Sequence, residues 1–225
     1  MLSGDDLKYI PRVLTFWDKL NERQKNSIIN NINPVHYEKG SRIHSGDNDC
    51  IGVILIKKGE LRIYILSEEG KEVTLYRLRD NEICVLSASC ILDNITFDVH
   101  VDAEVDSDVL LIDSYYYQQL CKQNIYAENF TDKLVIDSFS EVMWAMEQIL
   151  FMSFDKRLAI FLFDEITRNQ TDTIELTHEQ IAKYIGSARE VVSRMLKYFA
   201  REGIVELSRG GVKVIDKKKL KQLIL

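Results

Sequence analysis

Long apolar segments are missing from this chain of 225 residues. A membrane-spanning helix needs about 18 or more consecutive apolar residues, so we expect no segment to cross a membrane and predict no membrane partner. Met1 to Trp17 includes Asp5 and Asp6 and lacks the basic stretch followed by an apolar stretch that marks a secretory signal. These absences lead us to expect a cytoplasmic protein.

Cysteine is scarce and widely spaced. The four cysteines, Cys50, Cys84, Cys90 and Cys121, form neither a C-x-x-C pair nor the spacing of a zinc ribbon. In a reducing cytosol such residues are free thiols rather than disulfides. We therefore predict neither a structural disulfide nor a metal site.

Catalytic motifs are absent as well. The chain has no H-x-H or H-E-x-x-H metal motif, no G-x-S-x-G nucleophile motif and no glycine-rich loop that would hold a phosphate. An enzyme built on a cupin-like barrel would need clustered metal ligands, and His36, His44 and His100 do not have that spacing. We predict that the protein is not an enzyme, and we assign no catalytic residue.

The charges present are unevenly divided along the chain. Asp and Glu number 35 against 29 Lys and Arg, a net charge of −6. Residues 1–150 hold 15 basic and 25 acidic residues, a net −10, whereas residues 151–225 hold 14 and 10, a net +4. A basic end on an acidic chain points to nucleic-acid binding at that end. The length and the 46% hydrophobic content allow two folded domains.

The pattern between Val35 and Asp113 predicts short β-strands. Turn residues recur there at close intervals, and the segments between them are rich in Val, Ile, Leu and Tyr. Many short strands at regular spacing indicate a β-barrel or roll, whose last strand we place at residues 108–112. Before the roll, Asn21 begins a capping box that predicts a helix to about Asn31.

Residues 118–152 contain neither Gly nor Pro, so we predict one long helix there. Its apolar residues repeat at steps of four and three, the spacing of a coiled-coil seam. The stripe would pack either on its own roll or on its copy in a two-fold dimer. We favour the dimer, because the helix carries more apolar surface than one roll face should need. The predicted dimer stripe consists of Val135, Phe139, Val142, Met146 and Ile149.

Two capping boxes lie only ten residues apart in the last third of the chain. Thr177 and Ser187 would each begin a short helix, with Gly186 in the turn between them. Two helices joined by a tight glycine-containing turn form a helix-turn-helix, and a predicted hairpin over residues 204–215 follows as a wing. The second helix would bury Val192, Met195, Leu196 and Phe199.

The opposite face of that second helix suits DNA. Arg189 and Arg194 can each donate two hydrogen bonds to guanine O6 and N7, and Glu190 can accept one from a cytosine amino group. Glu190 could also simply close its capping box, and Lys197 and Arg201 could be solvated surface charges. Other residues would contact phosphates, which position a protein without reading sequence. The predicted DNA-binding residues are Thr177, Ser187, Arg189, Glu190, Ser193, Arg194, Lys197, Arg209 and Lys213.

The sequence resembles the Crp/Fnr family of cyclic AMP receptor and fumarate-nitrate regulator proteins. The most specific match is the run from Thr177 to Val205, with the pattern T-x-x-Q-I-A-x-x-I-G-S-A-R-E-V-V-S-R-x-L and a later G-I-V. Weaker matches lie in residues 39–43, 46–47 and 59–61. Together these matches extend over nearly the whole chain.

The resemblance implies an α+β fold with a cyclic-nucleotide-binding-like β-roll (jelly-roll barrel) in residues 1–117, a dimerisation helix in 118–152 and a winged helix-turn-helix in 153–225. A homodimer of this kind would bind a palindromic promoter site in double-stranded DNA, its recognition helices about 34 Å apart. RNA polymerase would be a further partner. The family's base-contacting positions fall on Arg189, Glu190 and Arg194, with Ser193 as a fourth in the Fnr-like branch.

The expected cofactor chemistry departs from two branches of that family. Its cyclic-nucleotide-binding members carry an Arg-Ser or Arg-Thr pair after a Gly-Glu, yet this chain has no arginine between Arg79 and Arg157. A buried phosphate needs a paired cation or equivalent donors, so cyclic AMP and cyclic GMP are disfavoured. No cysteine precedes Cys50, so an iron–sulfur cluster is disfavoured too. The cofactor stays unknown.

We place the effector pocket around the segment where the nucleotide would sit. Its two thiols and small residues could form a redox switch, a metal or haem contact, or an apolar pocket, or the cysteines could be buried small hydrophobes. The effector is thus an unknown small molecule or a redox signal. An alternative function is a ligand or redox sensor that binds DNA weakly or constitutively. The predicted pocket residues are Tyr76, Glu82, Cys84, Ser87 and Cys90.

Overall fold

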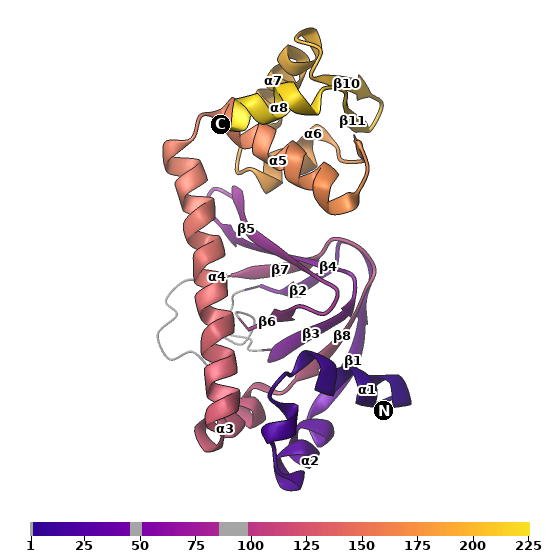
Figure 1. Cartoon of the computed structure of the whole chain (residues 1–225), viewed down its shortest axis with the longest axis vertical. Coiled ribbons are helices and arrows are strands. Elements are labelled where there is room, and N and C mark those ends of the chain that lie inside the picture. Colours follow the sequence, from indigo (N-terminus) through magenta and orange to yellow (C-terminus); the bar gives the residue numbers. More distant parts are fainter. Residues whose placement is uncertain (1, 46–50, 86–98) are drawn as a thin grey trace. The chain divides into compact units, whose positions relative to one another are not determined.

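A computed structural model describes residues 2–45, 51–85 and 99–225 of the chain (Figure 1). The chain divides into two compact units, Met1–Leu66 with Leu75–Val142 and Ser67–Thr74 with Met143–Leu225. The three-part division predicted from the sequence stays a prediction.

Helices precede the roll in the first unit. The first, α1 (Gly4–Val13), begins at a capping box in which Ser3 and Asp6 satisfy each other's backbone N–H groups. The same device starts α2 (Glu22–Asn30), where Asn21 is the cap and Gln24 its partner. The helix predicted after Asn21 is therefore confirmed. A short 3-10 helix, η1 (Trp17–Lys19), lies between them.

The roll consists of two four-stranded sheets with strand orders β1-β8-β3-β6 and β2-β7-β4-β5. The sheets share one apolar cluster, to which β3 and β8 contribute Ile54, Ile56 and Val109 and the other sheet contributes Ile63 and Val101. This arrangement confirms the predicted β-roll. Its strands are β1 (Ile32–Tyr37), β2 (Arg42–His44), β3 (Val53–Lys58), β4 (Glu60–Leu66), β5 (Glu72–Arg79), β6 (Ile83–Cys84), β7 (His100–Ala103) and β8 (Ser107–Ile112).

The helix predicted over residues 118–152 is two helices in the structure, α3 (Ser114–Gln123) and α4 (Ile125–Phe151). The chain leaves helical geometry at Asn124, whose φ and ψ are −142° and 107°. The Asn124 side chain then accepts hydrogen bonds from the backbone N–H groups of Tyr126 and Ala127, at 3.0 and 3.2 Å. Asparagine competes with helical hydrogen bonding in this way, so a stretch without Gly or Pro can still break.

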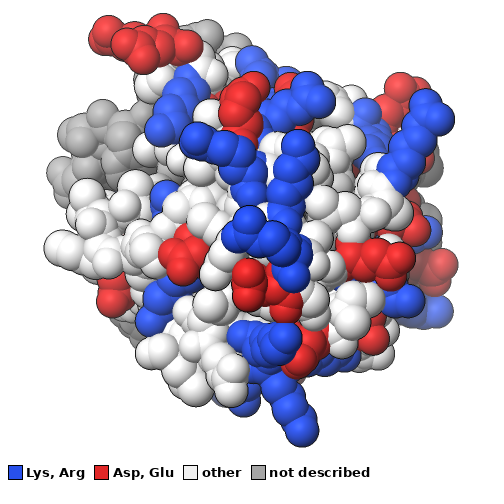
Figure 2. Space-filling view, turned by 90° about the horizontal axis from the view of Figure 1, so that it is seen from above, with Lys and Arg blue, Asp and Glu red and all other residues white. Residues whose placement is uncertain are grey.

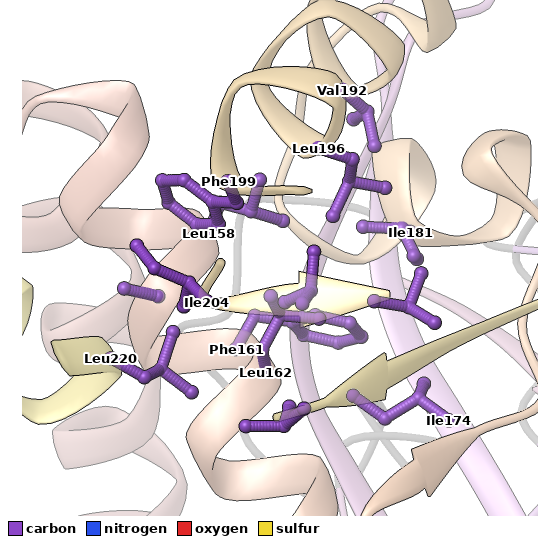
Figure 3. Packing of buried hydrophobic residues seen from close by; sticks show 14 of the residues in the cluster. Leu158, Phe161, Leu162, Ile174, Ile181, Val192, Leu196, Phe199, Ile204 and Leu220 are labelled. Atoms are coloured by element: carbon purple, nitrogen blue, oxygen red, sulfur yellow. The ribbon is translucent and has the colours of Figure 1, made fainter. Parts of the chain in front are cut away.

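The second unit packs helices around a three-stranded sheet of order β10-β11-β9. Leu158, Phe161 and Leu162 of α5 (Phe154–Asn169) contribute to its core, together with Leu196 and Phe199 of α7 (Arg189–Arg201) (Figure 3). The elements are α5 (Phe154–Asn169), β9 (Thr173–Ile174), α6 (His178–Tyr184), α7 (Arg189–Arg201), β10 (Val205–Ser208), β11 (Gly211–Val214) and α8 (Lys217–Ile224).

Among the described residues, no helix has both the length and the apolar character needed to cross a membrane.

Candidate nucleic-acid interface

The first helix of the helix-turn-helix, α6, begins as the sequence predicts. The Thr177 hydroxyl oxygen accepts a hydrogen bond from the Gln180 backbone N–H at 3.2 Å, and the Gln180 side chain accepts one from the Thr177 N–H at 2.9 Å. This capping box satisfies two of the N–H groups that a helix start leaves without partners. Both residues are thereby held at the start of α6.

The prediction that Ser187 caps the second helix is wrong. The cap position of α7 is Ala188, which has no side-chain hydrogen bond, and the helix begins at Arg189. Ser187 instead closes the end of α6, where its backbone N–H donates to the Ala182 carbonyl oxygen at 2.9 Å. Gly186 permits this closure because its φ is +59°, a left-handed value that favours glycine. Ser187 therefore belongs to the tight turn after α6, although the capping pattern assigned it to the start of α7.

The recognition helix α7 has one buried and one exposed face. Val192, Leu196 and Phe199 have no exposed surface, whereas Met195 is only half-buried. The face turned away from this core is polar. On it lie Arg189, Glu190, Arg194 and Lys197, all exposed, and Ser193, which is half-buried.

The two arginines on that face keep their hydrogen-bond donors available. Within the described parts of the chain, Arg189, Glu190 and Arg194 form no ion pair and no side-chain hydrogen bond. Their donors and acceptors therefore point to solvent and can meet a partner from outside. This is the arrangement that reading of base edges by a helix requires.

The predicted wing is present. Strands β10 and β11 pair antiparallel, with Glu206 opposite Lys213, and a turn from Ser208 to Gly211 joins them. Arg209 at the turn and Lys213 on the second strand are both exposed. The wing thus carries two basic side chains beside the helix-turn-helix in sequence, as predicted.

A hollow of about 330 Å³ lies between the start of α6, the start of α7 and the wing turn. It contains one residue that the sequence prediction did not include, His178. Burial lowers the pKa of His178, and the positive charges of Arg189 and Lys197 lower it further. A signal for it was present, since His178 directly follows the capping residue. The lining residues are Leu176, Thr177, His178, Glu179, Arg189, Ser208, Gly210 and Gly211.

Basic side chains gather on one face of the molecule. Figure 2 looks down from above the view of Figure 1 and shows Lys and Arg across the middle of this face, with acidic residues between them. In the sequence, residues 151–225 carry a net charge of +4. A basic face of this kind attracts a polyanion at long range.

Comparison with known proteins supports both units. A model described as a Crp-like helix-turn-helix domain matches residues 156–223, and a cyclic nucleotide-binding domain model matches residues 34–124. A solved structure from Eubacterium rectale, described as a transcriptional regulator of the Crp/Fnr family, is 46% identical. It covers 95% of this chain and 99% of that one, with a TM-score of 0.91.

The chain belongs to the Crp/Fnr family. This is a family of transcription regulators rather than enzymes, as the sequence predicts.

More distant similarities agree with the Crp/Fnr assignment. The structure of FixK2 from Bradyrhizobium japonicum is 16% identical over 85% of this chain and 96% of that one, with a TM-score of 0.69, which shows the fold alone. The transcriptional regulatory protein btr of Bordetella pertussis is 39% identical over 51 residues, which are 23% of this chain. That match spans only 21% of the length of btr.

The long helix of this Crp/Fnr protein presents a different stripe from the predicted one. Val135 and Val142 are half-buried and pack against the apolar clusters of their own roll, which is the alternative that the sequence left open, and their part in a dimer interface stays a prediction. Phe139 and Met146 are exposed, by 63% and 46%, and Ile149 by 40%. Val135 and Val142 face the roll because its apolar clusters lie next to this side of the helix.

The exposed stripe follows the heptad spacing of a coiled coil. Its members lie three, four, three and four residues apart, which places them along one line on a helix. These five side chains have no apolar cluster of their own chain to cover them in the described structure. We call them the α4 seam: Ile136, Phe139, Met143, Met146 and Leu150.

The predicted effector residues are only partly brought together. Tyr76 and Cys84 lie in the same apolar cluster of the roll, and burial raises the pKa of Tyr76. Glu82 is exposed, and its carboxylate accepts a hydrogen bond from the backbone N–H of Arg79 at 2.6 Å, so its place in an effector pocket stays a prediction. This hydrogen bond joins Arg79 and Glu82 across a turn of the chain. Ser87 and Cys90 lie outside the described residues.

Proposed function

We propose that this Crp/Fnr protein is a homodimeric, sequence-specific DNA-binding transcription regulator, controlled by an effector in the roll that is not a cyclic nucleotide. One observation carries the DNA-binding part. The exposed face of α7 presents two arginines and a glutamate that form no ion pair and no side-chain hydrogen bond with the described residues, on a helix whose opposite face is buried.

Base reading follows from the chemistry of this face. Arg189 and Arg194 can each give guanine two donors in the major groove, and Glu190 can accept from a cytosine amino group. Arg189 begins α7 and Glu190 follows it. The N-terminal residues of a recognition helix come nearest to the bases, which favours these two over later positions.

The phosphate contacts would come from residues around this helix. Thr177 lies at the cap of α6, Lys197 on the outer face of α7, and Arg209 and Lys213 on the wing. Ser187, which closes the turn between α6 and α7 through its backbone N–H, would be a further contact through its half-buried side chain. Contacts of this kind fix the register of a protein on the duplex without reading its sequence.

Dimer formation is supported by the α4 seam. Five large apolar side chains exposed by 45–63% would each gain favourable free energy from burial. The heptad spacing matches a parallel or antiparallel copy of the same helix, and a two-fold pair presents the same surface from both protomers. A two-fold dimer with two recognition helices fits a palindromic site.

Exclusion of cyclic nucleotides is supported by the ion pairs of the roll. Arg77 and Arg79 both contact the Glu60 carboxylate, at 3.0 and 2.7 Å. Arg62, only 3% exposed, contacts Asp102 and Glu104. These arginines already have carboxylate partners, so a phosphate would have to displace one of them.

Selection from a random duplex pool tests the DNA-binding proposal. We expect the protein to enrich an inverted repeat whose half-sites are centred about one helical turn, roughly 10 base pairs, apart. Arg194→Ala should lose preference at one position of each half-site and weaken binding by about 1–3 kcal/mol per half-site.

The matched control for that variant is Lys213→Ala. Loss of a phosphate contact should weaken binding equally for all sequences and reduce the dependence of affinity on salt. If no sequence is enriched, or if Arg194→Ala keeps the same preference and affinity, the proposed base reading is wrong.

A further inference from the structure

We propose that His178 is a phosphate-contacting residue of the DNA-binding surface and that it takes up a proton when a duplex binds. This inference rests on the proposed DNA-binding function and adds to it a proton-linked contact. Binding would therefore tighten as the pH falls.

The position of His178 supports the contact. It lines the hollow between α6, α7 and the wing turn together with Thr177 and Arg189, two of the predicted DNA-binding residues. From the wing, the hollow is lined by Ser208, Gly210 and Gly211, so no bulky side chain closes it on that side. A phosphate oxygen of a duplex lying on α7 would find a space open to it, with His178 in the wall.

The charges around His178 explain why its protonation should change. Arg189 and Lys197 of α7 act on it with positive charge, and Glu179 of its own helix lines the same hollow. The three wing residues that line the hollow carry no charge. The half-buried position and the two cations together hold the pKa of His178 below its ordinary value, so the imidazole is neutral at neutral pH in the free protein.

A phosphate close to His178 would have the opposite effect on its pKa. Its negative charge screens the two cations and favours the imidazolium, which can then donate a charge-assisted hydrogen bond. The pKa of His178 would thus be higher in the complex than in the free protein. Between these two values the complex binds one more proton than the separate partners, so affinity rises as pH falls, by at most about tenfold per pH unit at each contact.

The experiment measures binding of the selected duplex by fluorescence anisotropy from pH 8 to pH 6 at constant ionic strength. Wild-type protein should tighten about tenfold more over this range than His178→Gln, which cannot gain the charge. His178→Arg places a permanent cation at the same point, so it should bind at least as tightly as wild type at pH 8 and show a flatter profile. His36→Gln is the control, because His36 is an exposed histidine paired with Asp108 in the roll and should leave the wild-type slope unchanged.

A nuclear magnetic resonance titration of the histidine ring protons gives a second measurement. Addition of the duplex should move the His178 titration to higher pH and leave that of His36 in place. The inference is overturned if His178→Gln follows the wild-type pH profile, or if the His178 titration does not move. A wild-type protein that binds no duplex at any pH would instead overturn the proposed function.

Discussion

Gly59 illustrates how a single residue sets the geometry of the roll. It forms the turn between β3 and β4 with a φ of +127°, in the region that favours glycine. A Cβ atom added there would lie 2.2 Å from the Ser107 hydroxyl oxygen and 2.8 Å from the Ser107 Cα. Ser107 has no exposed surface, so it has no room to move aside. The close approach of two chain segments therefore requires the absence of a side chain.

Gly59→Ala should destabilise the protein by about 2–5 kcal/mol, the sum of backbone strain and overpacking. Gly40→Ala is the matched control, because Gly40 also has a positive φ, +83°, but has no atom within 4 Å of an added Cβ. It should cost only about 1–2 kcal/mol. Chemical denaturation with urea measures both. Equal losses in the two variants would show that contact with Ser107 is not what requires glycine at position 59.

Among the elements, α4 shows most clearly what sequence periodicity could and could not predict. The pattern correctly identified a helix with an apolar stripe, because steps of three and four are visible in the residues themselves. It placed the stripe one position away at Val135 and Val142, since it has no information on which face the roll covers. Both Val135 and its neighbour Ile136 are apolar, and only packing against the roll distinguishes them.

The other differences have the same physical origin. A capping motif describes local hydrogen bonding, so it located Thr177 correctly. It did not locate Ser187 correctly, because the backbone N–H of Ser187 donates to the Ala182 carbonyl oxygen at the end of α6. The exposed face of α7 was predictable, because its polar residues and its buried residues alternate with helical spacing. The position of His178 beside the capping residue was visible in the sequence, but its neighbours were not predictable, since they come from three elements that meet at one hollow.

A charge placed in the α4 seam should prevent dimer formation. Met143→Glu places a charge in the middle of the seam, and burying that charge in a dimer would be costly. We expect the variant to sediment as a monomer at concentrations at which the wild type is a dimer. Gln148→Glu adds the same charge to the same helix away from the seam, and it should remain dimeric. Analytical ultracentrifugation distinguishes the two, and a dimeric Met143→Glu would contradict the proposed interface.

In the whole molecule, acidic and basic residues are separated along the chain. The acidic excess lies in residues 1–150 and the basic excess in residues 151–225, so a duplex is attracted to one part and repelled by the other. The roll keeps its own arginines in carboxylate pairs, as Glu60 does with Arg77 and Arg79. The fold of a cyclic nucleotide-binding domain is thus combined with arginines that already have carboxylate partners.

That combination predicts that cyclic AMP will not stabilise the protein. A ligand that binds only the folded state at 100 times its dissociation constant raises the free energy of unfolding by about 2.7 kcal/mol. At about 1 mM, a ligand with a dissociation constant of about 10 µM would therefore raise the melting temperature by several degrees, and we expect no such rise with cyclic AMP or cyclic GMP. A rise of that size would show that a phosphate can displace a carboxylate from Arg62, Arg77 or Arg79. Glu60→Gln removes the shared partner of Arg77 and Arg79, and any affinity for cyclic AMP should appear first in this variant, because its two arginines lose the carboxylate that neutralises them.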